Sequence, residues 1–237
     1  MIILNLKKIR FGYLVTTNIE SYPIEEDVIV MFMLHKGKEL TPKQLKDILK
    51  ENEKAVYTRK GLLYLKNMHS THEFKVYLRG LGADDPTVEA ITNDFKKRHY
   101  LDDQYYAKIM VDRYKLKYGK SKIKQLLSSK GIHKDIIDTL KIETDEDNLS
   151  LKLDKAISLN KKPNYHQAKN SLLRQFVSKG YDLQIVSRLL DDKLKHVLFD
   201  DSRSLQKDIL KLFKKYDNLE VNQRLQKIKQ ALYQKGY

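Results

Sequence analysis

Three pairs of adjacent aspartates are the residues in this chain best suited to chemistry. They are Asp102/Asp103, Asp191/Asp192 and Asp200/Asp201. Neighbouring carboxylates can ligate a divalent metal or act as a general acid and base. The first and third pairs, however, occupy the same place at a repeated helix start, where an aspartate accepts hydrogen bonds from free backbone N–H groups. We therefore expect these aspartates to cap helices.

Other catalytic or metal-binding signals are weak. His69 and His72 stand three residues apart near an expected helix junction, where a solvated or capping histidine is more typical than a metal ligand. The chain has no cysteine, which excludes disulfides and cysteine-containing zinc or iron–sulfur sites. It also has no glycine-rich phosphate loop and no serine elbow. The sequence therefore predicts a protein that is not an enzyme and has no cofactor.

Two basic tracts without any acidic residue are more informative. One runs from Arg113 to Lys134 and the other from Lys155 to Tyr181. A solvated helix surface usually mixes both signs, so these tracts favour contact with nucleic acid, although a charge run can also be only a solvated face. Lys161, Lys162 and Lys169, around Pro163, are expected to face solvent. The predicted binding residues are Arg113, Lys115, Lys117, Lys120, Lys122, Lys124, Lys130, Lys161, Lys162, Lys169, Arg174 and Lys179.

Tyr114, Tyr118 and Tyr165 are interleaved with the basic residues. They could stack on bases, but tyrosines at helical spacing usually belong to a core.

The overall composition agrees with an acidic partner. The 237 residues include 46 Lys and Arg against 31 Asp and Glu, which gives a formal charge of +15. Hydrophobic residues make up 41%, enough for a packed core. The apolar run from Met1 to Leu6 ends at Lys7, too early for a signal peptide or a membrane span. We expect a cytoplasmic protein without a membrane helix.

The elements that position these residues follow from an internal repeat. Four similar segments end at Gly82, Gly131, Gly180 and Gly236, which are 49, 49 and 56 residues apart. Apolar residues stand eight and four positions before each glycine, the spacing of one buried helix face that ends at a glycine cap. The residues at these positions are Phe74/Leu78, Ile123/Leu127, Leu172/Phe176 and Ile228/Leu232.

A second and a third helix complete each repeat. Apolar residues six and nine positions after the first three glycines predict a following helix, and they are Val88/Ile91, Ile137/Leu140 and Val186/Leu189. Another helix is expected to start at Asp102 and again at Asp200. Such units bury their apolar faces by stacking, so we expect a mostly α-helical chain of tandem three-helix repeats in an elongated array.

The first forty residues differ from the rest. β-branched and aromatic residues between Ile2 and Tyr22 predict a small β-hairpin, and the acidic start at Glu25 predicts a short helix, with a strand as the alternative. Thr41-Pro42 is typical of a helix start. The expected organisation is an N-terminal extension (1–40), three repeats (41–101, 102–148 and 149–199) and an incomplete fourth repeat (200–237).

The middle repeat contains Leu101–Ala107, Arg113, Tyr118–Leu126 and Lys130–Ile132, and the first repeat contains Leu63–Leu65, Ser70, Glu73, Leu78 and Gly82. In spacing and residue type, these segments resemble the RecX family of recombinase regulators. The hairpin-like start and the fourth repeat are similar to its longer members from Gram-positive bacteria. The resemblance covers residues 41–237. The chain departs from the pattern in having Leu81-Gly82 where its other repeats have Lys-Gly, and in its incomplete fourth repeat.

This resemblance implies a cytoplasmic protein without enzymatic activity. We expect the protein to be a monomer. The resemblance also implies docking to the RecA–single-stranded DNA filament, with inhibition of the filament's recombinase, ATPase and coprotease activities. Three alternatives remain open from the residues alone. They are a general DNA- or RNA-binding repeat protein, a helical scaffold that binds only protein, and a metal-dependent nuclease that uses the aspartate pairs.

Overall fold

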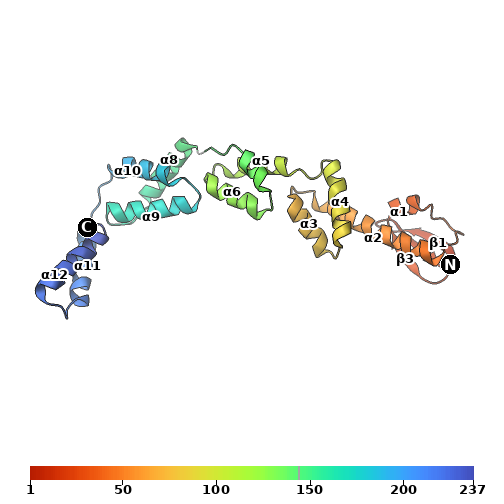
Figure 1. The fold of residues 1–237 in the computed structure, drawn as a ribbon, viewed down its shortest axis with the longest axis horizontal. Helices are drawn as coiled ribbons and strands as arrows, with labels where there is room; N and C mark the ends of the chain where they lie inside the picture. The colour runs from red at the N-terminus through yellow and green to blue at the C-terminus, as the bar shows by residue number, and fades with distance from the viewer. Residues whose placement is uncertain (144) are drawn as a thin grey trace. The chain divides into compact units, whose positions relative to one another are not determined.

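The computed structural model describes residues 1–143 and 145–237, and most of these residues are helical (Figure 1). In this described part, twelve helices follow three short strands. The helices are α1 (Glu26–Met31), α2 (Pro42–Tyr64), α3 (Thr71–Gly80), α4 (Asp85–Lys97), α5 (Asp103–Tyr114), α6 (Lys120–Ser129), α7 (Lys134–Thr139), α8 (Glu146–Ser158), α9 (Tyr165–Ser178), α10 (Leu183–Leu194), α11 (Ser202–Lys215) and α12 (Val221–Gln234).

The N-terminal strands form an antiparallel sheet. Strands β1 (Ile3–Lys8), β2 (Tyr13–Thr17) and β3 (Ser21–Ile24) pair in sequence order. The structure thus extends the predicted hairpin by a third strand, which contains Pro23. Proline is tolerated there because β3 is an edge strand, where a backbone N–H can be absent without breaking the ladder.

A small core joins this sheet to the helices. Ile3, Val15 and Ile24 of the strands are buried with Val28 of α1 and Ile48 of α2. Helix α1 is the short helix predicted after the acidic start at Glu25. Helix α2 begins at the predicted Thr41-Pro42 pair, and Thr41 forms a capping box with Gln44. The first half of α2 therefore belongs to the N-terminal core.

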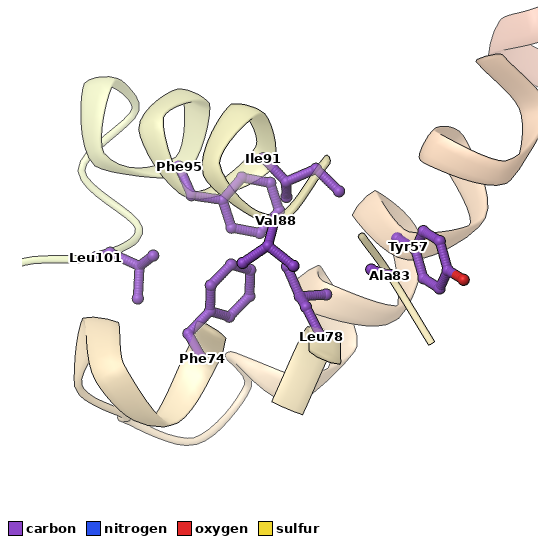
Figure 2. Packing of buried hydrophobic residues seen from close by; sticks show 8 residues of the cluster. All are labelled: Tyr57, Phe74, Leu78, Ala83, Val88, Ile91, Phe95 and Leu101. Carbon is purple, nitrogen blue, oxygen red and sulfur yellow. The ribbon is translucent and has the colours of Figure 1, made fainter. Parts of the chain in front are cut away.

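The second half of α2 packs into a three-helix core with α3 and α4 (Figure 2). Phe74 and Leu78 of α3 are fully buried against Val88 and Phe95 of α4. The rings of Phe74 and Phe95 lie 5.2 Å apart between centroids. These are the positions that the glycine register predicted, so the first repeat is built as expected.

The same core recurs in α8, α9 and α10. Leu172 and Phe176 of α9 take the places of Phe74 and Leu78, and Val186 of α10 takes the place of Val88. Leu149 and Leu153 of α8 complete the cluster. The 49-residue period therefore corresponds to a repeated three-helix packing.

One predicted helix is shorter than expected. Helix α7 ends at Thr139, so Leu140, which we expected on its buried face, lies just beyond it and is half-buried. The helix has only six residues, and its buried side chain is Ile137.

The chain divides into two compact units. The first comprises residues 1–106 and 130–136, and the second comprises residues 107–129 and 137–237. Among the residues that the structure describes, no helix is both long and apolar enough to span a lipid bilayer.

Candidate nucleic-acid interface

The middle helices of the repeats, α3, α6, α9 and α12, all end in the same glycine turn. Gly82, Gly131, Gly180 and Gly236 have φ between +73° and +94°, as the glycine register predicted. At three of the turns, a backbone N–H bonds to a carbonyl five residues earlier. These bonds run from Ala83 N to Leu78 O, from Tyr181 N to Phe176 O and from Tyr237 N to Leu232 O, at 3.1 to 3.2 Å. This is a helix end that requires a left-handed residue, which glycine adopts without steric cost.

Three of these turns also join one repeat to the preceding one. We define a repeat joint as the contact between such a turn and the N-terminus of the preceding middle helix. The turns at Gly131, Gly180 and Gly236 lie against the starts of α3, α6 and α9, respectively. A Cβ atom placed on Gly131 would lie 2.3 Å from Cβ of His72, and one on Gly180 would lie 2.2 Å from the backbone N of Lys122. The joints therefore need glycine for space as well as for φ.

Each repeat joint satisfies polar groups at a helix start. The hydroxyl of Ser70 donates to Lys130 O at 2.6 Å, and Gly119 N donates to Lys179 O at 2.9 Å. At the third joint, the side-chain amides of Asn164 and Gln167 donate to Lys235 O at 3.3 and 3.2 Å. The first N–H groups of a helix lack partners within the helix, and each joint places a carbonyl of the following repeat's turn against such a helix start.

The lysine before each joint glycine has a different environment in each repeat. Lys130 pairs with Glu73 at 2.6 Å, and Lys235 pairs with Asp208 at 2.8 Å. Lys179, in contrast, lies 5.0 Å from the ring centre of Phe176 and pairs with no carboxylate of the described residues. Of these three lysines, it is the one whose ammonium group remains available to an external anion.

Glu73 is held in its charged form at the first joint. Burial alone would raise its pKa, but hydrogen bonds from the Lys130 ammonium and from the Ser70 backbone outweigh burial and hold the pKa below its usual value. Tyr106 also donates to this carboxylate at 3.3 Å. Glu73 and Lys130 therefore act mainly in holding the joint together.

Four of the predicted binding residues form ion pairs with carboxylates that lie outside the two basic tracts. Lys115 pairs with Asp112 at 2.7 Å and Lys124 with Asp138 at 2.9 Å. The other two are Lys130, already described, and Lys169.

Lys169 does not face solvent as expected. Its ammonium group lies 2.6 Å from Asp191, its side chain is 24% exposed, and Tyr165 donates to the same carboxylate. The ammonium of Lys169 and the Tyr165 hydroxyl lower the pKa of Asp191, and this hydrogen bond raises the pKa of Tyr165 to about 12. Tyr165 also packs against the core of α8, α9 and α10. The interleaved Tyr165 is thus a structural residue.

Residues of both basic tracts come together in one pocket of about 340 Å³, which we call the lysine pocket. Lys117 enters it from the segment between α5 and α6, and Lys179 from the end of α9. Lys152 and Lys155 of α8 add two further ammonium groups, and the lining contains no carboxylate. The remaining lining residues are Leu116, Ala156, Leu159, Gln175 and Phe176. Four cations around an apolar floor suit a phosphate that carries an apolar or aromatic group.

Lys152 is fixed within this pocket. Its ammonium group donates to the carbonyl of Leu116 and, at 2.8 Å, to the hydroxyl of Tyr181. It also lies 5.5 Å from the ring centre of Tyr181. One cation is thus held in place by the fold, which lowers the entropy cost of binding an anion.

A second, larger hollow lies beside α9. This α9 groove has a volume of about 910 Å³ and lies between α9, the end of α12 and Asp208 of α11. Lys162 and Arg174, both predicted binding residues, line it. The other lining residues are His166, Gln167, Asn170, Ser171, Gln175, Ser178, Asp208, Tyr233, Gln234, Lys235 and Gly236. Gln175 lines both the α9 groove and the lysine pocket, so the two hollows adjoin across α9.

The remaining predicted residues lie outside these two hollows. Lys120 lines another pocket, which also contains Gly180, and Lys122 donates to Gln125 at 2.9 Å. Lys161 lines a pocket next to Pro163 and Phe199. Arg113 is exposed.

Several of the aspartates and histidines that the sequence singled out make contacts that support the fold. Asp102 caps α5 by accepting from Tyr105 N at 2.9 Å, as expected, and Asp200 accepts from Ser202 N at 3.2 Å. Asp103 instead accepts from Thr71 N at 2.8 Å, at the start of α3. His69 stacks on Tyr64 with ring centroids 3.9 Å apart. Among the described residues, no group of three or more His, Asp or Glu side chains is placed to hold a metal.

Three groups that line the hollows were missed by the sequence analysis. Lys152 stands two residues before Asp154, so it fell outside an acid-free tract. Gln175 and Tyr233 are uncharged, so the basic tracts did not point to them. The helical spacing of Arg174, Ser171 and Gln167, which places them on one face of α9, was the available sign of a polar groove.

Comparisons with known proteins identify relatives that align along most of this chain. No protein-family model matches the chain. The regulatory protein RecX of Streptococcus agalactiae serotype III is 30% identical over 246 residues, which cover 98% of this chain and 92% of the relative. The regulatory protein RecX of Halalkalibacterium halodurans is 28% identical over 93% of this chain and 86% of its own.

Solved structures agree on the fold. A crystal structure of regulatory protein RecX matches 81% of this chain and the whole of that chain, with a TM-score of 0.66 and 21% identity. The crystal structure of RecX from Lactobacillus salivarius matches 60% of this chain with a TM-score of 0.51 and 22% identity. Since a regulatory protein RecX that is 30% identical aligns along nearly the full length of both sequences, this chain belongs to the RecX family of regulatory proteins.

Proposed function

We propose that this protein is a non-enzymatic modulator of RecA that binds the RecA–single-stranded DNA filament and inhibits its recombinase, ATPase and coprotease activities. Membership of the RecX family supports a regulatory role. The observation that carries the nucleic-acid part of the proposal is the lysine pocket, where Lys117 and Lys179 of different basic tracts meet Lys152 and Lys155 without a carboxylate in the lining.

A filament presents protein and polyanion side by side. A chain that contacts both gains affinity, because the second contact forms at a high effective concentration once the first has formed. We therefore expect the protein to bind the filament at least about tenfold more tightly than it binds either free RecA or bare single-stranded DNA at the same salt. The protein acts in this role as a monomer in the cytoplasm.

The test measures binding of the unmodified protein to three targets at one salt concentration: RecA–single-stranded DNA filament, free RecA and bare single-stranded DNA. ATP turnover and strand exchange are followed in parallel. The proposal predicts tightest binding to the filament and slower turnover at sub-stoichiometric amounts. Equal affinity for filament and bare DNA, with strand exchange undiminished, would leave a general nucleic-acid binder in its place.

The polar α9 groove is the observation that favours the general DNA- or RNA-binding alternative, because hydrogen-bonding side chains line it beside a source of positive charge. A nuclease activity is tested separately by incubating DNA with the protein and magnesium. The proposal predicts intact DNA.

A further inference from the structure

We infer that the α9 groove is a binding site for an unpaired nucleobase, with Tyr233 as the stacking surface, and that the adjoining lysine pocket holds a neighbouring phosphate of the same strand. The inference rests on the proposed function, since it describes how the nucleic acid within that function is held. It identifies the ligand of the groove as a single base, and it predicts that the protein prefers single strands to duplex.

Tyr233 has a side chain that is largely exposed to solvent. Its side chain is 81% exposed and borders the groove near the end of α12, whereas Tyr57, Tyr106 and Tyr181 are buried in cores. The end of α12 is fixed by the third repeat joint, where Asn164 and Gln167 donate to Lys235 O. An aromatic face on a fixed helix end is a suitable surface for stacking, because little conformational entropy is lost when a base covers it.

The α9 side chains that line the groove together with Tyr233 offer the groups that read base edges. Asn170 and Gln175 carry amides, each with donors and an acceptor, and Arg174 carries a planar guanidinium. Amides and guanidinium groups form paired hydrogen bonds with base edges and recognise bases that are splayed out of a stack. Ser171 and Ser178 add hydroxyls that can donate or accept.

The one carboxylate in the groove does not repel a nucleic acid strongly. Asp208 pairs with Lys235 at 2.8 Å and accepts from the hydroxyl of Tyr237 at 3.2 Å. Its charge is therefore compensated within the protein. The other two Lys and Arg side chains of the lining, Lys162 and Arg174, form no ion pair with any carboxylate that the structure describes.

The two hollows have the spatial relation that a single strand requires. They share Gln175, so a ligand in one lies next to a ligand in the other. A nucleotide carries its phosphate beside its base, and the lysine pocket, which shares Gln175 with the groove, supplies four ammonium groups. In a duplex the bases are paired and stacked, so they cannot enter the groove without opening the helix.

The experiment compares two single-stranded oligonucleotides with the same number of phosphates, one of thymidines throughout and one with abasic sites in place of most bases. Binding is measured by fluorescence anisotropy at fixed salt. The inference predicts about tenfold tighter binding of the thymidine strand, since stacking on an aromatic side chain contributes at this level. Tyr233→Ala should lower affinity for the thymidine strand to that for the abasic strand and leave the abasic strand unaffected.

Two further variants make the result specific. Tyr233→Phe keeps the ring and should retain the preference for the thymidine strand. Tyr105→Ala removes a tyrosine that is 55% exposed but lies outside the groove, and it should change neither affinity. Because both tyrosine side chains are exposed, we expect both alanine variants to fold, which circular dichroism and thermal unfolding check.

The outcomes separate this inference from the proposed function. If both strands bind equally and with the same steep salt dependence, the base site is refuted while nucleic-acid binding stands. If neither strand binds to the protein at low salt, the nucleic-acid part of the proposed function fails, and the base site fails with it. Loss of abasic binding in Tyr233→Ala would also refute the stacking role.

Discussion

Gly180 illustrates how a single residue serves two purposes in this fold. Its φ of +84° ends α9, and its missing side chain lets the turn approach the backbone of Lys122. The sequence register predicted the first purpose from the helix that precedes the glycine. The second purpose depends on a helix almost sixty residues earlier, and no pattern along the chain shows which segment the turn will touch.

The two purposes can be separated by comparing Gly180→Ala with Gly37→Ala. Gly37 has a similar φ of +86°, but nothing lies within 4 Å of a Cβ placed on it. Gly37→Ala should lower the free energy of unfolding by about 1 kcal/mol through backbone strain alone. Gly180→Ala should lower it by about 2 kcal/mol more, because the joint must also open. Denaturant unfolding measures both, and equal losses would argue against the joint.

Glu73 should make the stability of the first joint depend on pH. Its pKa is lower in the folded protein than the usual 4.5, so the carboxylate stabilises the fold above that pH, and this contribution is lost as the pH falls through the folded pKa. Glu73→Gln should therefore cost about 1–2 kcal/mol at pH 7 and much less at pH 3.

The matched control for this prediction is Glu89→Gln. Glu89 pairs with Lys75 at 2.5 Å, but its side chain is 47% exposed, so this surface pair should contribute little at either pH. Unfolding free energies of the two variants at pH 7 and pH 3 provide the comparison. If the cost of Glu73→Gln were the same at both pH values, the joint would not depend on the charged carboxylate.

At the scale of helices and the segments between them, the lysine pocket should account for part of the salt dependence of binding. Each phosphate contact with single-stranded DNA contributes a slope of roughly −0.7 to the plot of log affinity against log salt. Replacing Lys117 and Lys179 together with alanine should flatten the slope by about 1.4. Lys115→Ala with Lys124→Ala removes two lysines already paired with carboxylates and should flatten the slope by less than half as much. Equal effects of the two double variants would contradict the pocket.

The helices themselves were largely predictable, because a buried helix face and its glycine cap are local features. Phe74/Leu78 and Leu172/Phe176 stand at equal distances before their glycines, and this spacing predicted the repeated core. The Thr41-Pro42 pair predicted the start of α2. The third strand, Ser21–Ile24, was missed because the expected extended structure ended at Tyr22 and formed only a hairpin. Helix α7 was expected to include Leu140, but it ends one residue earlier.

The candidate binding surface was less predictable for a physical reason. A tract without acids along the chain is not a surface without acids in space, because other helices bring carboxylates to it. Asp191 reaches Lys169 from α10, and Asp138 reaches Lys124 from α7. Packing also adds residues to the site that the tract lacks, of which Lys152 is the clearest example.

For the molecule as a whole, the question is whether affinity follows net charge or a local site. Lys7→Glu with Lys8→Glu and Lys117→Glu with Lys179→Glu each lower the formal charge from +15 to +11. Lys7 and Lys8 are exposed on β1, far along the chain from the lysine pocket. The first double variant should bind single-stranded DNA within about twofold of the unmodified protein, and the second should bind at least about tenfold more weakly. Similar losses in a binding titration would indicate that total charge governs the interaction.

The repeat joint also has an evolutionary consequence. Each joint consists of a glycine turn with its carbonyl on one side and a helix start with its cap on the other, and every internal repeat carries both halves. When a gene segment that encodes one repeat is duplicated in frame, the new copy carries a glycine turn and a helix start that match those of both neighbouring repeats. It can therefore form a joint on each side without further mutation. Whole repeats can therefore be gained or lost by recombination, whereas an insertion of a few residues inside a middle helix would displace the turn from its partner and be removed by selection.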